Sequence, residues 1–315
     1  MVDSGWLMER YSNYHQPITN HLFTTFWQFC TMIEPEQAIE STGIRSTWMI
    51  ALASVIGLGV YLYPFALPTI HQTASGSTRA GEAPIVLCGL ILLCLAAILR
   101  EIDPMRNGEG AARIVALLAS MVAIGAVARL IPSFLGASPI FLLVILGGYV
   151  FGPAFGFQLG ALTLAVSAFL TGGIGPWVPY QMLGVGWVGM LAGLLPKPAR
   201  RERQLAILAG YGAVSGLIFG ALLNLWFWPF AAPGGGDVSP GLSWSPDLSL
   251  AEALGRYLRF YVVTSLWFDI FRSMGNVVLI LALGRPILGT LERYRLRFTW
   301  QRWAAEPTIE ARPLA

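Results

Sequence analysis

Charged residues are scarce in this chain: they make up 12% of its 315 residues, against about a quarter in an ordinary soluble domain. Hydrophobic residues make up 55%, and the mean hydropathy is +0.63. Such a composition excludes a water-soluble fold, which needs more polar surface. It also excludes disorder, which requires low hydrophobicity. The apolar runs are long and continuous rather than alternating, which argues against a transmembrane β-barrel. We therefore predict an all-α, polytopic helical membrane protein.

The motifs of nucleotide and acid–base chemistry are also missing. The single lysine, Lys197, follows no glycine-rich loop, so the chain cannot form a phosphate-binding G-x-x-x-x-G-K-[ST] loop. No H-E-x-x-H or G-x-S-x-G pattern occurs. The three cysteines give neither a disulfide framework nor metal-ligand spacing. We expect no enzyme, cofactor or metal site. The net charge of +3, without a basic stripe, gives no reason to expect nucleic-acid binding. The polar start of the chain predicts no signal peptide.

Eight apolar runs approach the length of about 20 residues that a spanning helix needs. They are Thr47–Ile70, Pro84–Leu99, Ala111–Ile131, Pro139–Gly152, Ala154–Thr171, Pro179–Leu195, Leu205–Phe230 and Tyr257–Gly284. The fourth is short and meets the fifth at Gly152–Pro153, which favours a tight helical hairpin. One bent or re-entrant element is the alternative.

Basic residues gather on one side of these segments. They follow the second, sixth and eighth runs, as Arg100, Arg106, Lys197, Arg200, Arg201, Arg203, Arg285, Arg293, Arg295, Arg297, Arg302 and Arg312. By the positive-inside rule both termini are predicted to be cytoplasmic, which an even number of spans satisfies. The connections 132–138, 172–178 and 231–256 then lie outside, and a solute is expected to bind beneath them.

The eighth segment carries three polar residues that a bilayer tolerates poorly. Asp269, Arg272 and Asn276 are spaced by three and four, so they share one helical face. Asp269 and Arg272 can pair, and a structural ion pair between helices explains them as well as a polar wall of a solute cavity does. Arg259 and Arg129 lie near outer helix ends. Their side chains can snorkel to the headgroups, which we favour, or face a ligand, which is the alternative.

Several other candidate residues lie near the predicted outer ends. Asn224 lies inside the seventh segment, and Trp228 follows it, where an aromatic belt is the alternative explanation. The stretch 172–196 starts with too many glycines and prolines for a continuing helix, so its backbone must lie in water or line a cavity. Trp177, Tyr180 and Gln181 in this stretch complete the candidate solute site.

Small residues repeat at a spacing of four in two segments. Gly189 and Gly193 form G-x-x-x-G, which indicates close helix contact, either inside the protein or in a groove for another protein's helix. The third segment offers Ala112 with Ala116, and Ala119 with Ala123, on two stripes.

The run LVILGGYVFGPAFGFQLGALTLAVSAFLTGGIGPWVPYQMLGVGWVGMLAGLLP, within residues 139–196, resembles the substrate-binding (S) component of energy-coupling factor (ECF) vitamin transporters, in the branch common in high-GC bacteria. NLWFWPF at 224–230 and RYLRFYVVTSLWFDIFRSMGNVVLILALG at 256–284 continue the resemblance, which covers most of residues 48–288.

The resemblance implies an organisation and a set of partners. Residues 1–46 form an N-terminal cytoplasmic or interfacial segment, 47–110 two additional helices, 111–288 a six-helix core, and 289–315 a basic cytoplasmic tail. Such a subunit resides in the bacterial plasma membrane and docks through an alanine pattern on its first core helix. Its partners are a transmembrane coupling (T) subunit and two cytosolic ABC ATPases. It captures a vitamin or related micronutrient outside, and a cobalamin-like corrinoid is the solute that the likeness favours.

Two further classes of function stay open on the sequence. A stand-alone secondary transporter would use Asp269 and Arg272 as an ion-coupled switch. A membrane-integral enzyme would need an acid–base or metal constellation, and only Asp269 is a carboxylate within the predicted spans. A purely structural membrane subunit is the remaining alternative.

Overall fold

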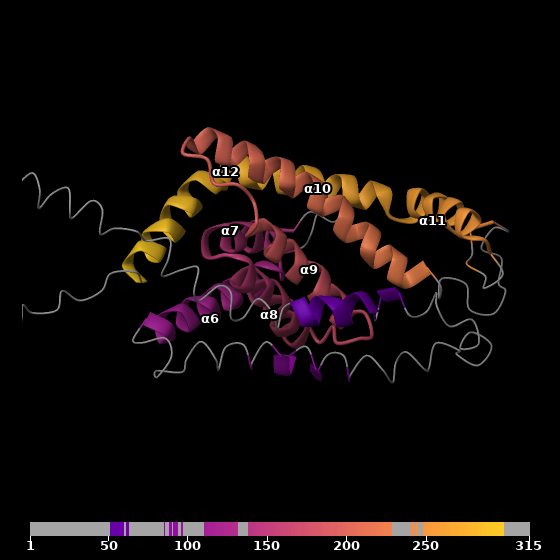
Figure 1. The fold of residues 1–315 in the computed structure, drawn as a ribbon, viewed down its shortest axis with the longest axis horizontal. Helices are drawn as coiled ribbons and strands as arrows, with labels where there is room; N and C mark the ends of the chain where they lie inside the picture. The colour runs from indigo at the N-terminus through magenta and orange to yellow at the C-terminus, as the bar shows by residue number, and fades with distance from the viewer. Residues whose placement is uncertain are drawn as a thin grey trace, which may run out of the picture. The chain divides into compact units, whose positions relative to one another are not determined.

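The computed structural model describes residues 51–59, 61–62, 110–131, 138–228 and 248–298, with isolated positions at 85–96 and 241–244. All of them belong to one unit of the chain, Gly43–Ala315. Within these residues every regular element is a helix, as the composition predicts (Figure 1). The predicted N-terminal segment 1–46 and the C-terminal residues after 298 lie outside the described ranges.

Seven labelled helices follow one another from residue 110 onward. They are α6 (Gly110–Ala128), α7 (Ile140–Phe151), α8 (Pro153–Thr171), α9 (Val178–Ala192), α10 (Arg201–Phe227), α11 (Leu250–Thr264) and α12 (Leu266–Phe298). Among the described residues, three stretches are long and apolar enough to cross a membrane: Pro153–Thr171, Arg201–Phe227 and Leu266–Leu296. Residues 113–128 of α6 and the whole of α7 are apolar but shorter. The chain is therefore a helical membrane protein.

The predicted hairpin at Gly152–Pro153 is confirmed. Gly152 alone separates α7 from α8, and its φ of 99° lies in the left-handed region that suits glycine. Pro153 then starts α8, where a missing backbone N–H costs nothing. The Phe151 and Phe155 rings, 4.7 Å apart, pack across the turn. α7 is buried along nearly its whole length, which explains how so short a helix holds its place.

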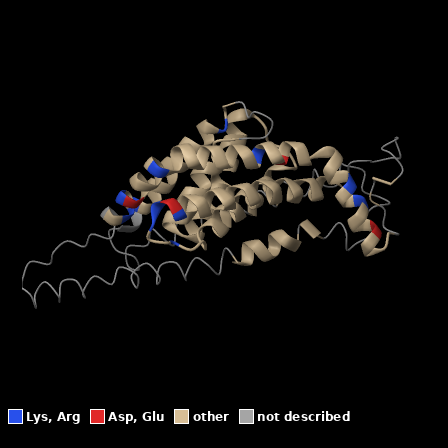
Figure 2. Cartoon of the chain, turned by 90° about the horizontal axis from the view of Figure 1, so that it is seen from above, with Lys and Arg blue, Asp and Glu red and all other residues tan. Residues whose placement is uncertain are grey.

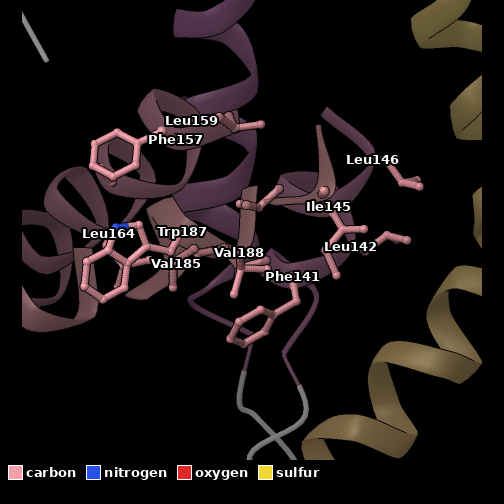
Figure 3. Close-up of a cluster of buried hydrophobic side chains, with 14 of the residues drawn as sticks. Phe141, Leu142, Ile145, Leu146, Phe157, Leu159, Leu164, Val185, Trp187 and Val188 are labelled. Atoms are coloured by element: carbon pink, nitrogen blue, oxygen red, sulfur yellow. The ribbon is translucent and has the colours of Figure 1, made fainter. Parts of the chain in front are cut away.

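Glycines bring α7, α8 and α9 into backbone contact. A Cβ placed on Gly156 would meet the backbone of Gly189, and one on Gly160 would lie 2.5 Å from the carbonyl oxygen of Val185. Since later positions in α8 pair with earlier ones in α9, the two helices run antiparallel. The large apolar side chains around this contact form the core shown in Figure 3. Gly189 and Gly193 thus serve internal packing, and the alternative of an external groove at these two glycines is wrong.

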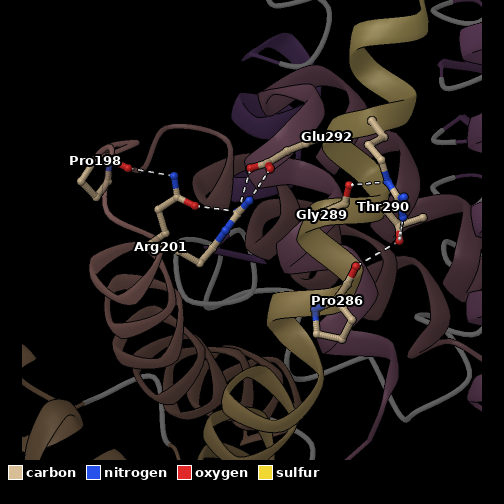
Figure 4. A network of polar contacts seen from close by, with 8 residues as sticks. Pro198, Arg201, Pro286, Gly289, Thr290 and Glu292 are labelled. Carbon is tan, nitrogen blue, oxygen red and sulfur yellow. Dashed lines mark hydrogen bonds and ion pairs between the residues drawn. The ribbon is translucent and has the colours of Figure 1, made fainter.

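α10 and α12 form a second antiparallel pair. Gly212, Gly216 and Gly220 lie along one face of α10, and a Cβ on Gly216 would come within 2.7 Å of the Ser273 hydroxyl of α12. At the basic end, Arg201 donates to both carboxylate oxygens of Glu292 at 2.8 and 2.5 Å (Figure 4). Most charges of the bundle gather at this end (Figure 2).

The eighth predicted segment, Tyr257–Gly284, is not one helix. α11 begins seven residues earlier, at Leu250, where Ser249 and Glu252 form a capping box. It ends at Thr264, and α12 starts after Ser265, whose φ and ψ are −129° and −32°. The Ser265 hydroxyl donates to the Asp269 carboxylate at 2.9 Å, which stabilises the first turn of α12. A hydrophobicity pattern cannot reveal such a break, because neither glycine nor proline marks it.

The helical residues 51–59 and 61–62 pack against α9. The Tyr61 hydroxyl donates to the carbonyl oxygen of Tyr180 at 2.8 Å, and the Trp187 indole N–H donates to Ser54 at 2.9 Å. A Cβ on Gly57 would lie 2.9 Å from the Leu183 side chain. This part of the first predicted segment is therefore joined to the core, at the helix that follows the glycine-rich connection.

Candidate solute site

The sequence-predicted site residues fall into three groups in the structure. Trp177, Tyr180 and Gln181 lie at the start of α9, Asn224 and Trp228 at the end of α10, and Asp269, Arg272 and Asn276 in α12. The chain direction puts the end of α10 and the starts of α9 and α12 at the end of the bundle opposite the Arg201–Glu292 pair.

The α12 group faces α10 rather than an open cavity. Asp269 and Asn276 are fully buried, and Asp269 pairs with Arg272 within the helix. The Arg272 guanidinium stands 5.2 Å above the centre of the Phe219 ring and donates to the Gly216 carbonyl at 3.4 Å.

Glycines make room for this polar face. A Cβ on Gly220 would collide with the Asp269 carboxylate, and one on Gly212 would lie 3.3 Å from Cβ of Asn276. The Asn276 amide donates to the Gly212 carbonyl at 2.9 Å. This geometry favours the structural interpretation of the pair, because a lone buried charge is costly whereas a paired one can be accommodated.

Asn224 and Trp228 connect α10 to α11 and to the connection before it. The Asn224 amide donates to the Thr264 hydroxyl at 3.1 Å. The buried Trp228 donates to the Leu242 carbonyl at 2.8 Å, and its ring lies 5.4 Å from that of Tyr257. Both residues therefore hold α11 against the end of α10.

Three helices contribute to a cluster that we call the Arg129 cluster, made of Arg129, Ser167 and Gln181. Arg129 follows the last turn of α6, and one of its terminal nitrogens donates to the Ser167 hydroxyl of α8 at 3.0 Å. The other donates to the Gln181 side-chain oxygen of α9 at 3.2 Å. Arg129 is half-buried. Instead of extending toward the lipid headgroups, the Arg129 guanidinium makes these two hydrogen bonds to α8 and α9.

Aromatic rings adjoin the Arg129 cluster along α9. The buried Tyr180 ring lies 4.7 Å from Trp226 of α10 and 5.1 Å from Tyr61. Trp177 is 44% exposed, just before α9, so it is available to contact a solute. Of the predicted residues, Tyr180 and Gln181 thus join one polar and aromatic region, whereas the α12 group is separated from α9 by Phe219, which contacts Gly184.

Ser167 and Tyr61 are the members of this region that sequence reasoning missed. Ser167 is one serine within an apolar run, and Tyr61 lies in the first predicted segment, far along the chain from α9. Arg129 could be noticed in the sequence, because a charged residue at the end of a predicted span lies either at the membrane–water interface or in a binding site.

The alanines of α6 face outward. Ala116, Ala119 and Ala123 are exposed, whereas Leu118, Met121 and other residues on the opposite face are buried. Ala112 belongs to the same helix, and its side chain lies outside the described residues. Both predicted stripes therefore occupy one face of α6. Among the described residues, no three His, Cys, Asp or Glu side chains are close enough to hold a metal ion.

Comparison with known families gives one match. Residues 113–284 match the family described as "ECF transporter, substrate-specific component". The matched range begins within α6 and ends within α12, so it contains α7 to α11 completely and parts of α6 and α12. No curated protein and no solved structure matches the chain.

Proposed function

This chain belongs to the substrate-specific components of ECF transporters, and from this we propose that it captures a vitamin-class solute outside the cell for import. Members of the family are membrane-embedded, substrate-binding subunits of transporters rather than enzymes. The observation that carries the proposal is the family match over residues 113–284, more than half of the chain.

The arrangement of the helix ends supports capture from the outside. Gly125 of α6 contacts Thr163 of α8, and Arg129, one turn later, bonds to Ser167, so these two helices run parallel. α9 runs antiparallel to α8, so the end of α6, the end of α8 and the start of α9 meet at one end of the bundle. The opposite end carries the basic residues, which the positive-inside rule assigns to the cytoplasm. The Arg129 cluster then opens toward the outside, in a multi-pass protein of the bacterial plasma membrane.

The proposal includes three partner proteins. A transmembrane T subunit and two cytosolic ABC ATPases supply the energy, since the chain has no phosphate-binding loop of its own. We assign the exposed alanine face of α6 to the contact with the T subunit, because small side chains let two helix backbones approach closely in a membrane.

The candidate solute is a vitamin or related micronutrient. The proposal of a cobalamin-like corrinoid rests on the family resemblance, and cyanocobalamin is therefore the first solute to test. We propose that Trp177, Tyr180 and Gln181 contact the solute, and that Asn224, Trp228, Asp269, Arg272 and Asn276 support this site through the packing of α10 against α11 and α12. The geometry favours the α9 members, while the α12 members act through the packing of α10 on α12.

The test is uptake by a bacterial host that lacks an ECF importer. Mass spectrometry of the medium, with cyanocobalamin included, compares cells that express this chain alone with cells that also express its T subunit and ATPases. We expect depletion of a solute only with the complete set. Depletion by the chain alone, abolished by a protonophore, would contradict the proposal and identify an ion-coupled carrier.

A further inference from the structure

The Arg129 cluster contains more hydrogen-bond donors than its protein acceptors use. A guanidinium has five N–H donors. Two of those on Arg129 are used, by Ser167 at 3.0 Å and Gln181 at 3.2 Å, and the other three have no acceptor among the residues that the structure describes. Because the Gln181 oxygen accepts from Arg129, its amide nitrogen is turned away from the guanidinium, and it donates to none of the described residues. The Ser167 hydroxyl already donates to the Leu164 carbonyl at 3.0 Å.

The charge of Arg129 also has no counterion among the described residues. Both of its hydrogen-bond partners are neutral, in contrast to Arg272, which pairs with Asp269, and Arg201, which pairs with Glu292. An unpaired charge at the boundary of a membrane is unfavourable unless something else compensates it. Two neutral acceptors from two other helices fix the guanidinium in place without neutralising it.

We propose that Arg129, with the Gln181 amide, binds an oxyanion of the captured solute, a carboxylate or a phosphate. This inference rests on the proposed function and names its substrate class: an anionic solute. A guanidinium presents paired N–H donors that match the two oxygens of such a group, and these charge-assisted bonds are stronger than neutral ones. Holding Arg129 in place beforehand reduces the entropy that binding would otherwise cost.

Neighbouring contacts keep the cluster rigid. The Tyr61 hydroxyl fixes the carbonyl of Tyr180, directly before Gln181, at 2.8 Å. Thr171 donates to the carbonyl of Ser167 at 2.9 Å. Arg129 at the end of α6, residues of α8 and α9, and Tyr61 therefore all determine where the anion sits. The site is a property of the folded bundle rather than of one loop.

The experiment uses two probes of nearly the same size and shape: benzoate, which is an anion, and benzamide, which has the same ring and a neutral amide in place of the carboxylate. The full chain, purified in a maltoside detergent, is titrated with each at constant ionic strength, and binding is followed by tryptophan fluorescence. We expect benzoate to bind and benzamide not to bind. Arg129→Gln should weaken benzoate binding by at least about tenfold, as expected for a lost charge-assisted contact. Arg113→Gln, which alters an exposed arginine at the other end of α6, should leave it unchanged.

A second variant keeps the test valid if Arg129→Gln does not fold. Gln181→Glu places a carboxylate where the amide oxygen now accepts from Arg129, so the protein supplies its own anion. We expect this variant to unfold at a higher temperature than the wild type and to lose benzoate binding. Equal binding of both probes, binding of neither, or unchanged benzoate binding in Arg129→Gln would overturn the proposal.

Lipid is the other possible source of an oxyanion. Nanodiscs of phosphatidylcholine are compared with nanodiscs that contain phosphatidylglycerol. If Arg129→Gln weakens retention of phosphatidylglycerol while benzoate has no effect on the wild type, the group bound is a lipid headgroup and the proposal fails. A failed benzoate or lipid experiment does not change the result of the uptake test on the complete importer. A failed uptake test, in turn, does not change benzoate binding by the purified chain. The anion site and the proposed function are therefore tested separately.

Discussion

Arg272 and Arg129 differ in whether a carboxylate neutralises their charge. We use this difference to assign a structural role to Arg272 and a binding role to Arg129. Arg272 has a carboxylate in its own helix, a carbonyl of α10 and an aromatic face beneath it. Within the described part of the chain, the acceptors that Arg129 contacts are both neutral. Sequence spacing placed Asp269, Arg272 and Asn276 on one face of a helix, but it could not show that this face meets the glycines of α10.

The buried pair allows a prediction about stability. Asp269→Asn leaves the Arg272 charge without its partner and should lower the free energy of unfolding by about 3–5 kcal/mol. The double variant Asp269→Asn/Arg272→Gln should lose less than the sum of the two single variants. Thermal unfolding of all four proteins in detergent measures the coupling, and strict additivity would show that the pair makes no contribution.

At the scale of single elements, glycine determines which helices touch. The sequence shows many glycines within the predicted helices, and their presence alone does not reveal which of them touch a neighbouring helix. The structure separates them: Gly189 contacts the backbone of α8, whereas a Cβ on Gly210 would meet nothing within 4 Å. The partner of a glycine stripe depends on tertiary contacts that the stripe itself does not encode.

This contrast gives a matched pair of variants. Gly189→Ala should lower the unfolding temperature strongly and reduce the yield, because its Cβ would collide with the Gly156 carbonyl. Gly210→Ala should leave the protein unchanged, or stabilise it by up to about 1 kcal/mol, because alanine favours the helix. If both variants unfold at the same temperature, the packing described for α8 and α9 is wrong.

The outer face of α6 permits a test of docking that does not depend on stability. Ala119→Leu adds bulk to the exposed alanine face and should reduce recovery of the T subunit with the tagged chain, while the unfolding temperature stays the same. Ala282→Leu, at an exposed alanine of α12, is the control and should not affect recovery. Equal recovery with both variants would place the docking surface elsewhere.

At the scale of the whole molecule, composition predicts the class of the fold and charge distribution predicts its orientation. The hairpin at Gly152 followed from a Gly–Pro pair, and the loop before α9 from its glycines and prolines. The break at Ser265 could not be predicted from hydrophobicity, because Thr264 and Ser265 interrupt the apolar run only briefly and neither glycine nor proline marks the break. The Arg129 cluster could not be predicted either, since its three members lie on three helices and meet only in the folded chain.

The predicted orientation can be tested with single cysteines introduced after the native cysteines are replaced by alanine. Ile174→Cys, exposed in the connection between α8 and α9, should react with a membrane-impermeant maleimide on intact cells. Ala199→Cys, exposed between α9 and α10, should react only after the membrane is permeabilised. The reverse labelling pattern would place the Arg129 cluster on the cytoplasmic side.

The central claim is that this chain works as one subunit of an ATPase-driven importer. The most direct measurement is mass spectrometry of the proteins that co-purify with the tagged chain from its own membranes in a mild detergent. The account predicts one polytopic membrane subunit and two ABC-type ATPases. If the chain repeatedly purifies without ATPases, under conditions that keep a known ABC complex intact, the claim is contradicted.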